Sequence, residues 1–211
     1  MEAILKALAG LITAMSGQLG LVIGVVLGFL SSVLTEPVRD RLFGPKLQVE
    51  FDPDKQGFAT HTKDNIGHDF VQASYIRVLA TNKRKRIAKQ CRAYLSGVEM
   101  WNASLRRFEP TLYCEALQLA WSASPEGRAF DPVDIPKDVR KFVDVVSVRE
   151  GSTSIRSHVI AHLYRYEDML TKQSGKFRYT VLVAGDNMKP QSVKVGLEWN
   201  GDFKQYRVFK G

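Results

Sequence analysis

Hydrophobic and polar positions divide the chain into two parts with different patterns. Residues 7–35 contain no Asp, Glu, Lys or Arg, whereas charged residues are frequent in the rest of the chain. A membrane-spanning helix needs roughly 20 mostly apolar residues. Proline disfavours helical geometry in the residue before it, so Pro37 marks the expected end of the helix. The pattern predicts a single transmembrane helix within residues 1–35.

Three other structures fit the length and flanking residues of this run less well. A cleaved signal would have a shorter apolar region and small residues before the cut site, and 33–35 (Val-Leu-Thr) fits poorly. A buried core helix would rarely carry so long a charge-free run. A hairpin turning at 16–18 would leave arms of about 13 and 16 residues, short against the length of a span. The first turns, from Ile4 to Met15, are amphipathic and fit either an interfacial turn or the outer end of a tilted helix.

Small residues recur every four positions along the predicted helix. Such residues let helix backbones approach closely in lipid, where packing drives helix association. The spacing places them on one face and creates two overlapping G-x-x-x-G motifs. The pattern predicts self-association or packing on another membrane protein, although glycine is also frequent in membrane helices generally. The predicted interface consists of Ser16, Gly20, Gly24, Gly28 and Ser32.

Basic residues on either side of the run predict its orientation. Lys6 and the amino terminus precede it, whereas Arg39, Arg41 and Lys46 follow within about 15 residues. Basic flanks stay on the cytoplasmic side of a membrane. We therefore predict a single-pass membrane protein with its N-terminus outside and its C-terminal domain in the cytoplasm. The runner-up is a periplasmic or extracellular domain in which the two cysteines pair.

Beyond a short connector at 36–46, the hydrophobic period is two, which is typical of half-buried strands. Turn-forming residues separate the alternating segments, and 200–202 (Asn-Gly-Asp) predicts a tight hairpin. Seven to nine short strands predict a mainly β domain over 47–211, an antiparallel β-sandwich or small barrel. The alternating sets begin at Leu47, Ile76, Cys91, Leu117, Arg140, Val159, Phe177, Val193 and Tyr206.

Part of this domain resembles bacterial immunoglobulin-like sandwich domains. Residues 75–82, a basic turn and residues 88–95 resemble the B-to-C region of such domains, where an alternating strand ends in an Asn-containing turn. Residues 133–136, 142–146 and 179–187 resemble their E and F strands. The resemblance covers roughly residues 70–200 and implies an immunoglobulin-like β-sandwich. Adhesion, adaptor and ligand-binding proteins use this fold, so it does not assign a function by itself.

Composition and charge narrow the class of protein. The 211 residues are 45% hydrophobic and 25% charged, which excludes a disordered chain. Of the net charge of +8, residues 47–211 carry 26 basic and 19 acidic side chains, a net +7. The chain has two cysteines, Cys91 and Cys114, which are too few for a small domain held together by disulfides. Their spacing matches no metal-binding or redox motif.

The densest charge is the run Lys83, Arg84, Lys85 and Arg86. Basic residues close to a bilayer attract anionic lipid headgroups, by about 1 kcal/mol each. The run is a candidate membrane or anion contact, and its alternative is a solvated hairpin tip. No aromatic residues interleave with it, so we expect no nucleic-acid partner.

Neither the spacing of the histidines nor any short catalytic motif indicates a metal site or an active site. His61 and His68 lie in a polar segment that we expect to be an exposed loop, and their spacing matches no zinc site. His158 and His162 are expected to be solvent-facing strand residues. No G-x-S-x-G, P-loop, H-E-x-x-H, C-x-x-C or G-x-G-x-x-G motif is present. We therefore predict no catalytic, metal or cofactor site. Trp101, Trp121, Trp199, Phe142 and Tyr179 are expected to pack in the core or at the sandwich edge.

Two functions from different classes fit these patterns. The first is a membrane-anchored, non-enzymatic interaction or sensor module that self-associates through its helix. The second is a ligand-activated membrane effector, whose β-domain binds a small anionic molecule such as a cyclic nucleotide while its helices perturb the bilayer. The layout of membrane helix plus small β-domain is similar to that of some bacterial antiviral effectors. The expected partners are membrane lipid and a second copy or another membrane protein.

Overall fold

The computed structural model describes residues 25, 28–29, 44–66, 69–160, 166 and 174–211. The chain divides into two compact units, Met1–Gly44 and Pro45–Gly211. Val25, Gly28 and Phe29 of the first unit are helical and exposed. The other residues of the predicted span lie outside the described part. Among the described residues, no helix has the length and hydropathy needed to cross a membrane.

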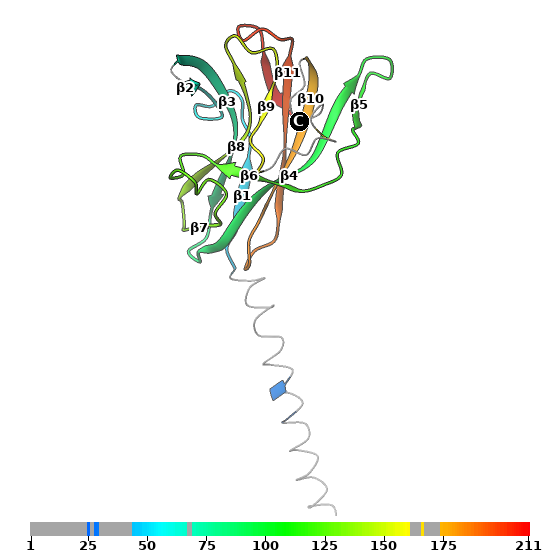
Figure 1. Cartoon of the computed structure of the whole chain (residues 1–211). Coiled ribbons are helices and arrows are strands. Elements are labelled where there is room, and N and C mark those ends of the chain that lie inside the picture. The colour runs from blue at the N-terminus through cyan, green and yellow to red at the C-terminus, as the bar shows by residue number, and fades with distance from the viewer. Residues whose placement is uncertain (1–24, 26–27, 30–43, 67–68, 161–165, 167–173) are drawn as a thin grey trace, which may run out of the picture. The chain divides into compact units, whose positions relative to one another are not determined.

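The second unit is an antiparallel β-structure, as its alternating sequence predicts (Figure 1). Its described residues form twelve strands in one curled sheet. The strands are β1 (Leu47–Glu50), β2 (Ala59–Ile66), β3 (Asp69–Asn82), β4 (Ala88–Asn102), β5 (Arg107–Pro110), β6 (Leu117–Trp121), β7 (Val133–Ile135), β8 (Arg140–Arg149), β9 (Arg156–Ser157), β10 (Gly175–Ala184), β11 (Gln191–Trp199) and β12 (Arg207–Lys210).

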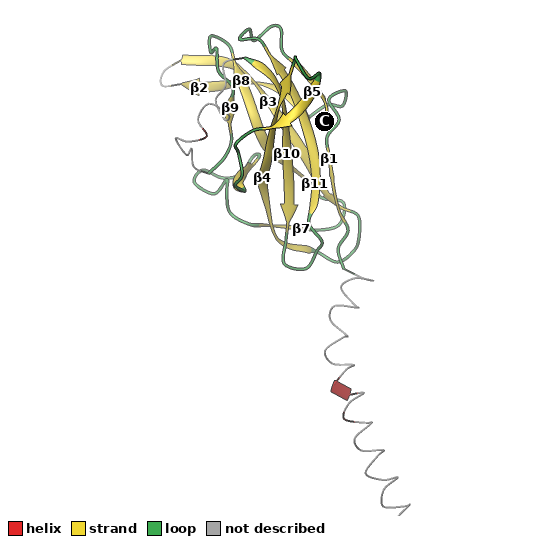
Figure 2. Cartoon of the chain, turned by 90° about the vertical axis from the view of Figure 1, so that its right-hand side faces the viewer, coloured by secondary structure: helices red, strands yellow, loops and turns green. Residues whose placement is uncertain are grey.

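The main path of the sheet runs β1-β3-β8-β6-β4-β10-β11-β12, and the remaining strands pair at its sides. Strand β6 joins two layers, because Leu119 pairs with Ala93 of β4 while Trp121 pairs with Val143 of β8. Strands that change sheet in this way form the corners of a sandwich. The result is a curled sheet with two facing layers, compatible with the predicted β-sandwich (Figure 2).

The core forms where the alternating apolar residues of the two layers meet. In β10, Phe177, Tyr179, Val181 and Val183 are buried and alternate with partly exposed residues, as predicted. Burying a large apolar side chain stabilises a fold by about 1.5–3 kcal/mol, so this face fixes the register of the strand. The largest fully buried side chains of the described core include Trp121, Trp199, Tyr179, Phe58 and Phe177.

The structure differs from the sequence prediction in several segments. It has more strands than the seven to nine predicted, because β5, β7 and β9 are too short to give an alternating pattern in the sequence. The polar segment after Ala59 is strand β2 rather than a loop, because it pairs along β3 from Ala59↔Ile76 to Ile66↔Asp69. Of the strand expected to begin at Val159, the described residues show only an isolated bridge between Val159 and Leu119, because residues 161–165 lie outside the described part. The two-residue strand β9 comes before this segment.

The predicted tight hairpin after β11 is a longer turn. Seven residues separate Trp199 from Arg207, the ends of β11 and β12. Asn200 Oδ1 accepts from the Asp202 amide at 3.0 Å, and Asp202 Oδ1 accepts from the Lys204 amide at 2.9 Å. These side chains compete with the backbone pairing of a two-residue turn and widen the loop.

Candidate functional site

The predicted basic run forms the turn between β3 and β4. Lys83, Arg84 and Lys85 are exposed, and Arg86 is half-buried. The Lys83 amide donates to the Lys46 carbonyl at 2.9 Å. The turn therefore lies beside the point where the chain from residues 36–46 enters the β-domain. That is a position the sequence alone did not predict.

Asn82 holds this turn in place from inside the domain. It is fully buried, and its Nδ2 donates to the Arg86 carbonyl at 2.6 Å and to the Ile135 carbonyl at 3.0 Å. Its Oδ1 accepts from the Arg84 amide at 3.1 Å. Buried polar groups must be hydrogen-bonded, and here one side chain satisfies three backbone groups. The Asn-containing turn noted in the sequence is thus the structural pivot of this end of the domain.

Two further loops join the basic turn. The Asp138 amide of the β7–β8 loop donates to the Asn82 carbonyl at 2.8 Å. In the β10–β11 loop, Asn187 Nδ2 donates to the Ile87 carbonyl at 3.0 Å, and its Oδ1 accepts from the Lys89 amide at 3.0 Å. We call the combined surface the basic loop surface. It comprises Lys46 and the loops at 83–87, 136–139 and 185–190.

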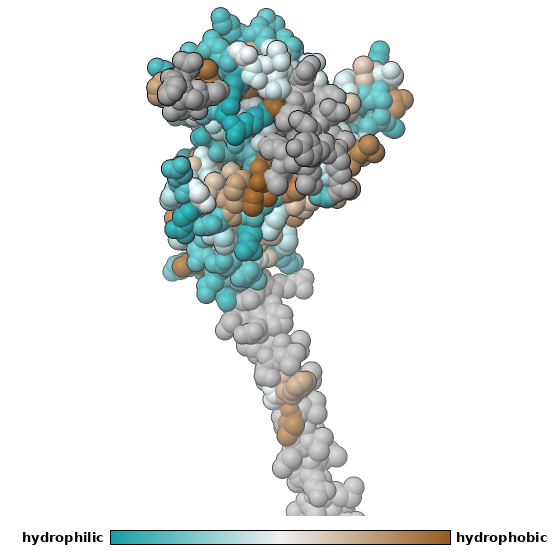
Figure 3. Space-filling view, viewed as in Figure 1, coloured by the Kyte–Doolittle hydropathy of each residue, from teal (hydrophilic) through white to brown (hydrophobic). Residues whose placement is uncertain are grey.

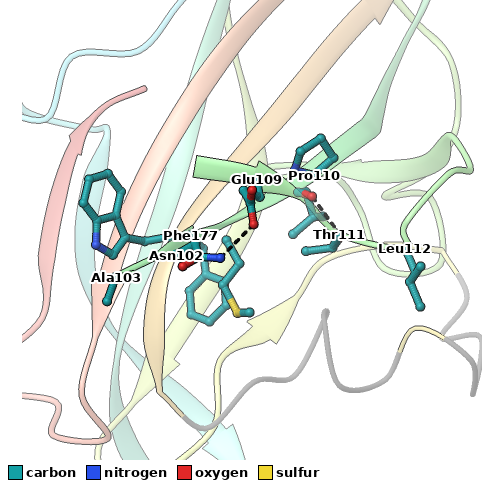
Figure 4. Close-up of a pocket in the computed structure, with 10 residues that line it drawn as sticks. Asn102, Ala103, Glu109, Pro110, Thr111, Leu112 and Phe177 are labelled. Carbon is teal, nitrogen blue, oxygen red and sulfur yellow. Dashed lines mark hydrogen bonds between the residues drawn. The ribbon is translucent and has the colours of Figure 1, made fainter. Parts of the chain in front are cut away.

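A cleft lies at the other end of β4, beneath the β4–β5 hairpin (Figure 4). Its volume is about 560 Å³. The lining begins at Val98, ten residues after Ala88 at the start of β4, so at about 3.3 Å per residue the cleft lies roughly 33 Å along the strand from the end that carries the basic turn. Its described lining is mainly apolar and includes Val98, Met100, Trp101, Pro110, Leu112 and Phe177.

Two large apolar side chains of the cleft lining are exposed, Leu112 to 84% and Met100 to 41%. Leu105, in the turn between β4 and β5, is 53% exposed. The hairpin stands away from the body of the domain, and Figure 3 shows apolar surface on this projection at the upper right. Large apolar side chains exposed at an apolar cleft indicate a candidate interaction site.

The polar groups of the cleft are few and fixed. Asn102 Nδ2 donates to Glu109 Oε2 at 2.8 Å, and Arg107 pairs with Glu109 Oε1 at 2.9 Å. The hydrogen bond from Asn102, followed by that from Arg107, holds the pKa of Glu109 below its usual value. Glu109 is the ionisable residue among those that line the cleft, so the lining favours an apolar occupant over an anionic one.

Aromatic rings and cations brace the outer face of the same hairpin. The Arg178 guanidinium lies 3.9 Å from the centre of the Phe108 ring. Lys176 Nζ lies 5.1 Å from the Trp101 ring and 5.0 Å from the Phe209 ring. Cation–π contacts of this geometry contribute about 0.5–1 kcal/mol each at exposed sites. They hold the projecting hairpin in a defined position.

The expected solvent-facing position of His158 is wrong. Its ring packs 5.0 Å from the Tyr75 ring, and its Nε2 lies 3.0 Å from Ser147 Oγ. Burial, followed by the charges of Arg156 and Arg149, lowers the pKa of His158 to about 4. Because Ser147 is fully buried, this serine–histidine pair serves packing rather than nucleophilic chemistry.

A polar network adjoins this pair. The Tyr75 hydroxyl donates to Asp64 Oδ1 at 2.7 Å, and Arg149 pairs with Asp64 Oδ2 at 2.5 Å. Arg77 pairs with Asp144 at 2.8 Å. Burial raises the pKa of Asp144, which the charge of Arg77 opposes. These pairs tie β2, β3 and β8 together.

The remaining histidines and the two cysteines form no site among the described residues. His61 is exposed beside Phe203 and Tyr206, while His68 and His162 lie outside the described residues. No group of three metal-ligating side chains occurs among the residues that the structure describes. Cys91 is buried and Cys114 exposed, and both are free thiols rather than the disulfide of the runner-up topology.

The aromatic residues divide between the core and the cleft. Trp121, Trp199 and Tyr179 are buried, as expected, and Phe142 is half-buried. Trp101 lines the cleft, a role that the alternating pattern of β4 did not distinguish from edge packing.

Only one member of the predicted helix interface can be described. Gly28 is helical, and a Cβ added to it meets nothing within 4 Å. Ser16, Gly20, Gly24 and Ser32 lie outside the described residues.

No protein-family model matches the chain, and no curated protein matches it.

Proposed function

We propose that this chain is a membrane-anchored, non-enzymatic interaction module. In this proposal residues 1–35 form a single membrane span that self-associates through its small-residue face. An immunoglobulin-like β-sandwich over residues 47–211 faces the cytoplasm. The basic residues that follow the span support this orientation.

The observation that carries the proposal is the cleft under the β4–β5 hairpin. Its apolar lining includes the exposed side chains of Met100 and Leu112, which we take as the recognition surface. The cleft lies at the end of β4 away from Lys46, where the anchor joins the domain. An apolar side chain from a polypeptide partner fits this lining, since buried apolar anchors dominate protein interfaces.

A photo-crosslinking amino acid at Leu112 tests this function in the full chain, in its membrane. We expect a discrete crosslinked polypeptide that disappears when Met100→Glu places a charge at the rim. The matched control, Ser192→Glu, alters an exposed position of β11 and should leave the product unchanged. Identical crosslinking patterns from positions 112 and 192 would contradict the proposed cleft.

The second candidate is the ligand-activated effector, which the basic loop surface favours. A surface with excess positive charge attracts small anions. In that case a cyclic nucleotide would raise the melting temperature of the chain and make cells that express it leaky. A chain that responds to no cyclic nucleotide in either assay would not be such an effector.

A further inference from the structure

We infer that the basic loop surface docks on an anionic lipid headgroup layer and inserts two apolar side chains into it. The inference rests on the proposed function, because the predicted span is what brings the domain to a bilayer. It adds a second membrane contact, from the folded domain itself, and names its residues.

Hydrogen bonds join the three loops into one surface. The Asp138 amide and the Ile135 carbonyl both bond to Asn82, and Asn187 clasps the chain on either side of Ala88. Loops held by side-chain bonds in this way keep their charges in a fixed arrangement. A fixed arrangement loses less conformational entropy on binding.

The basic loop surface has a net positive charge. Lys46 and the three loops hold seven basic and two acidic side chains, a net charge of +5. One of the acids, Asp138, is already paired with Lys137 at 3.4 Å. Anionic lipids give the cytoplasmic leaflet a negative surface potential, which attracts clusters of this kind. The basic side chains are Lys46, Lys83, Arg84, Lys85, Arg86, Lys137 and Lys189.

Two exposed apolar side chains lie among these charged residues. Ile87 is 41% exposed and Val139 37% exposed. Each follows directly on a charged segment, and each lies in a loop bonded to Asn82 or Asn187. Apolar side chains flanked by basic residues are the pattern of interfacial membrane contacts. A solvated tip would gain nothing from exposing them.

The basic loop surface includes Lys46, the last residue of the connector at 36–46. Because the Lys83 amide bonds to the Lys46 carbonyl, the surface begins where the connector ends. Residues 36–46 extend at most about 40 Å when fully stretched, so a domain tethered by them can reach the headgroups. The three loops contain no aromatic residue, so they offer nucleic-acid bases no stacking platform.

The experiment reads the depth of position 87 in the full chain, reconstituted in vesicles. Ile87→Cys is labelled with an environment-sensitive fluorophore in a Cys114→Ser background, since Cys91 is buried. Leu105→Cys, at the tip of the β4–β5 hairpin, is the matched control. The vesicles contain phosphatidylcholine alone or mixed with phosphatidylserine, and nitroxide lipids serve as quenchers.

We expect quenching and a blue shift at position 87 in phosphatidylserine vesicles, and neither at position 105. Replacing Lys83, Arg84 and Lys85 with glutamine should weaken the contact about a hundredfold, and high salt should weaken the contact of the unchanged protein. Equal quenching at positions 87 and 105 would overturn the inference. So would protection of the label by a soluble cyclic nucleotide, which would assign the surface to a small anion.

Flotation separates failure of this inference from failure of the proposed function. A chain that stays with vesicles after alkaline washing, but shows no quenching at position 87, keeps its anchor and loses the lipid-docking surface. A chain that the alkaline wash releases has no membrane span. In that case flotation at neutral pH that requires phosphatidylserine and the three basic residues would support the docking surface alone.

Discussion

Replacing Asn82 with alanine should destabilise the β-domain more than any other single change at the basic loop surface. The substitution removes donations to the Arg86 and Ile135 carbonyls and the acceptance from the Arg84 amide. Each net hydrogen bond contributes about 1 kcal/mol, and a buried carbonyl left without a partner adds to the cost. We expect the free energy of unfolding to fall by about 3–4 kcal/mol.

Denaturant unfolding of the full chain in detergent measures this loss. The intrinsic fluorescence of Trp121 and Trp199, both buried, reports on the β-domain core. Asn187→Ala is the matched control, because it also removes one donation and one acceptance, but at an exposed site. We expect that control to cost less than about 1 kcal/mol. If both variants lose the same stability, Asn82 is not the pivot of this surface.

Two further predictions concern the helix and the half-buried His158. Gly28→Leu should weaken self-association of the full chain in membranes, because a bulky side chain on the small-residue face would keep two helix backbones apart; unchanged energy transfer between labelled copies would refute the interface. The pKa of His158 is lowered to about 4, so the unfolded chain binds this proton more readily and the domain loses stability as pH falls from about 6.5 to 4, by about 2–3 kcal/mol. In His158→Gln the loss over this range should shrink by that amount, and unfolding curves with identical pH dependence in both proteins would show that the ring is not buried as described.

The sequence predicted the strands whose apolar residues alternate, and it did so for a physical reason. In β10 and β11 one face is buried and the other is not, so period two is visible along the chain. In β2 the buried contribution is small and the strand forms by pairing along β3, which leaves a polar sequence without a strand signal. Tertiary pairing, rather than local preference, decided that segment.

The candidate sites were predictable only in part. The basic run was evident, but its place beside Lys46 depends on a hydrogen bond between residues far apart in the chain. The cleft combines residues of β4, β5 and β10 that carry no common motif. His158 appeared to be a surface residue, because Tyr75 and Ser147, which enclose it, come from other strands. Sites assembled across strands leave no spacing signal in the sequence.

The most direct test of the account asks whether the chain spans a membrane and which side the β-domain faces. Cys114 is the exposed thiol of the two, which suits it to a membrane-impermeant thiol reagent in cells that express the full chain. We predict that the protein stays in the membrane after alkaline extraction, and that Cys114 reacts only after the cells are permeabilised. Release by alkaline extraction would contradict the anchor, and labelling in intact cells would place the domain outside.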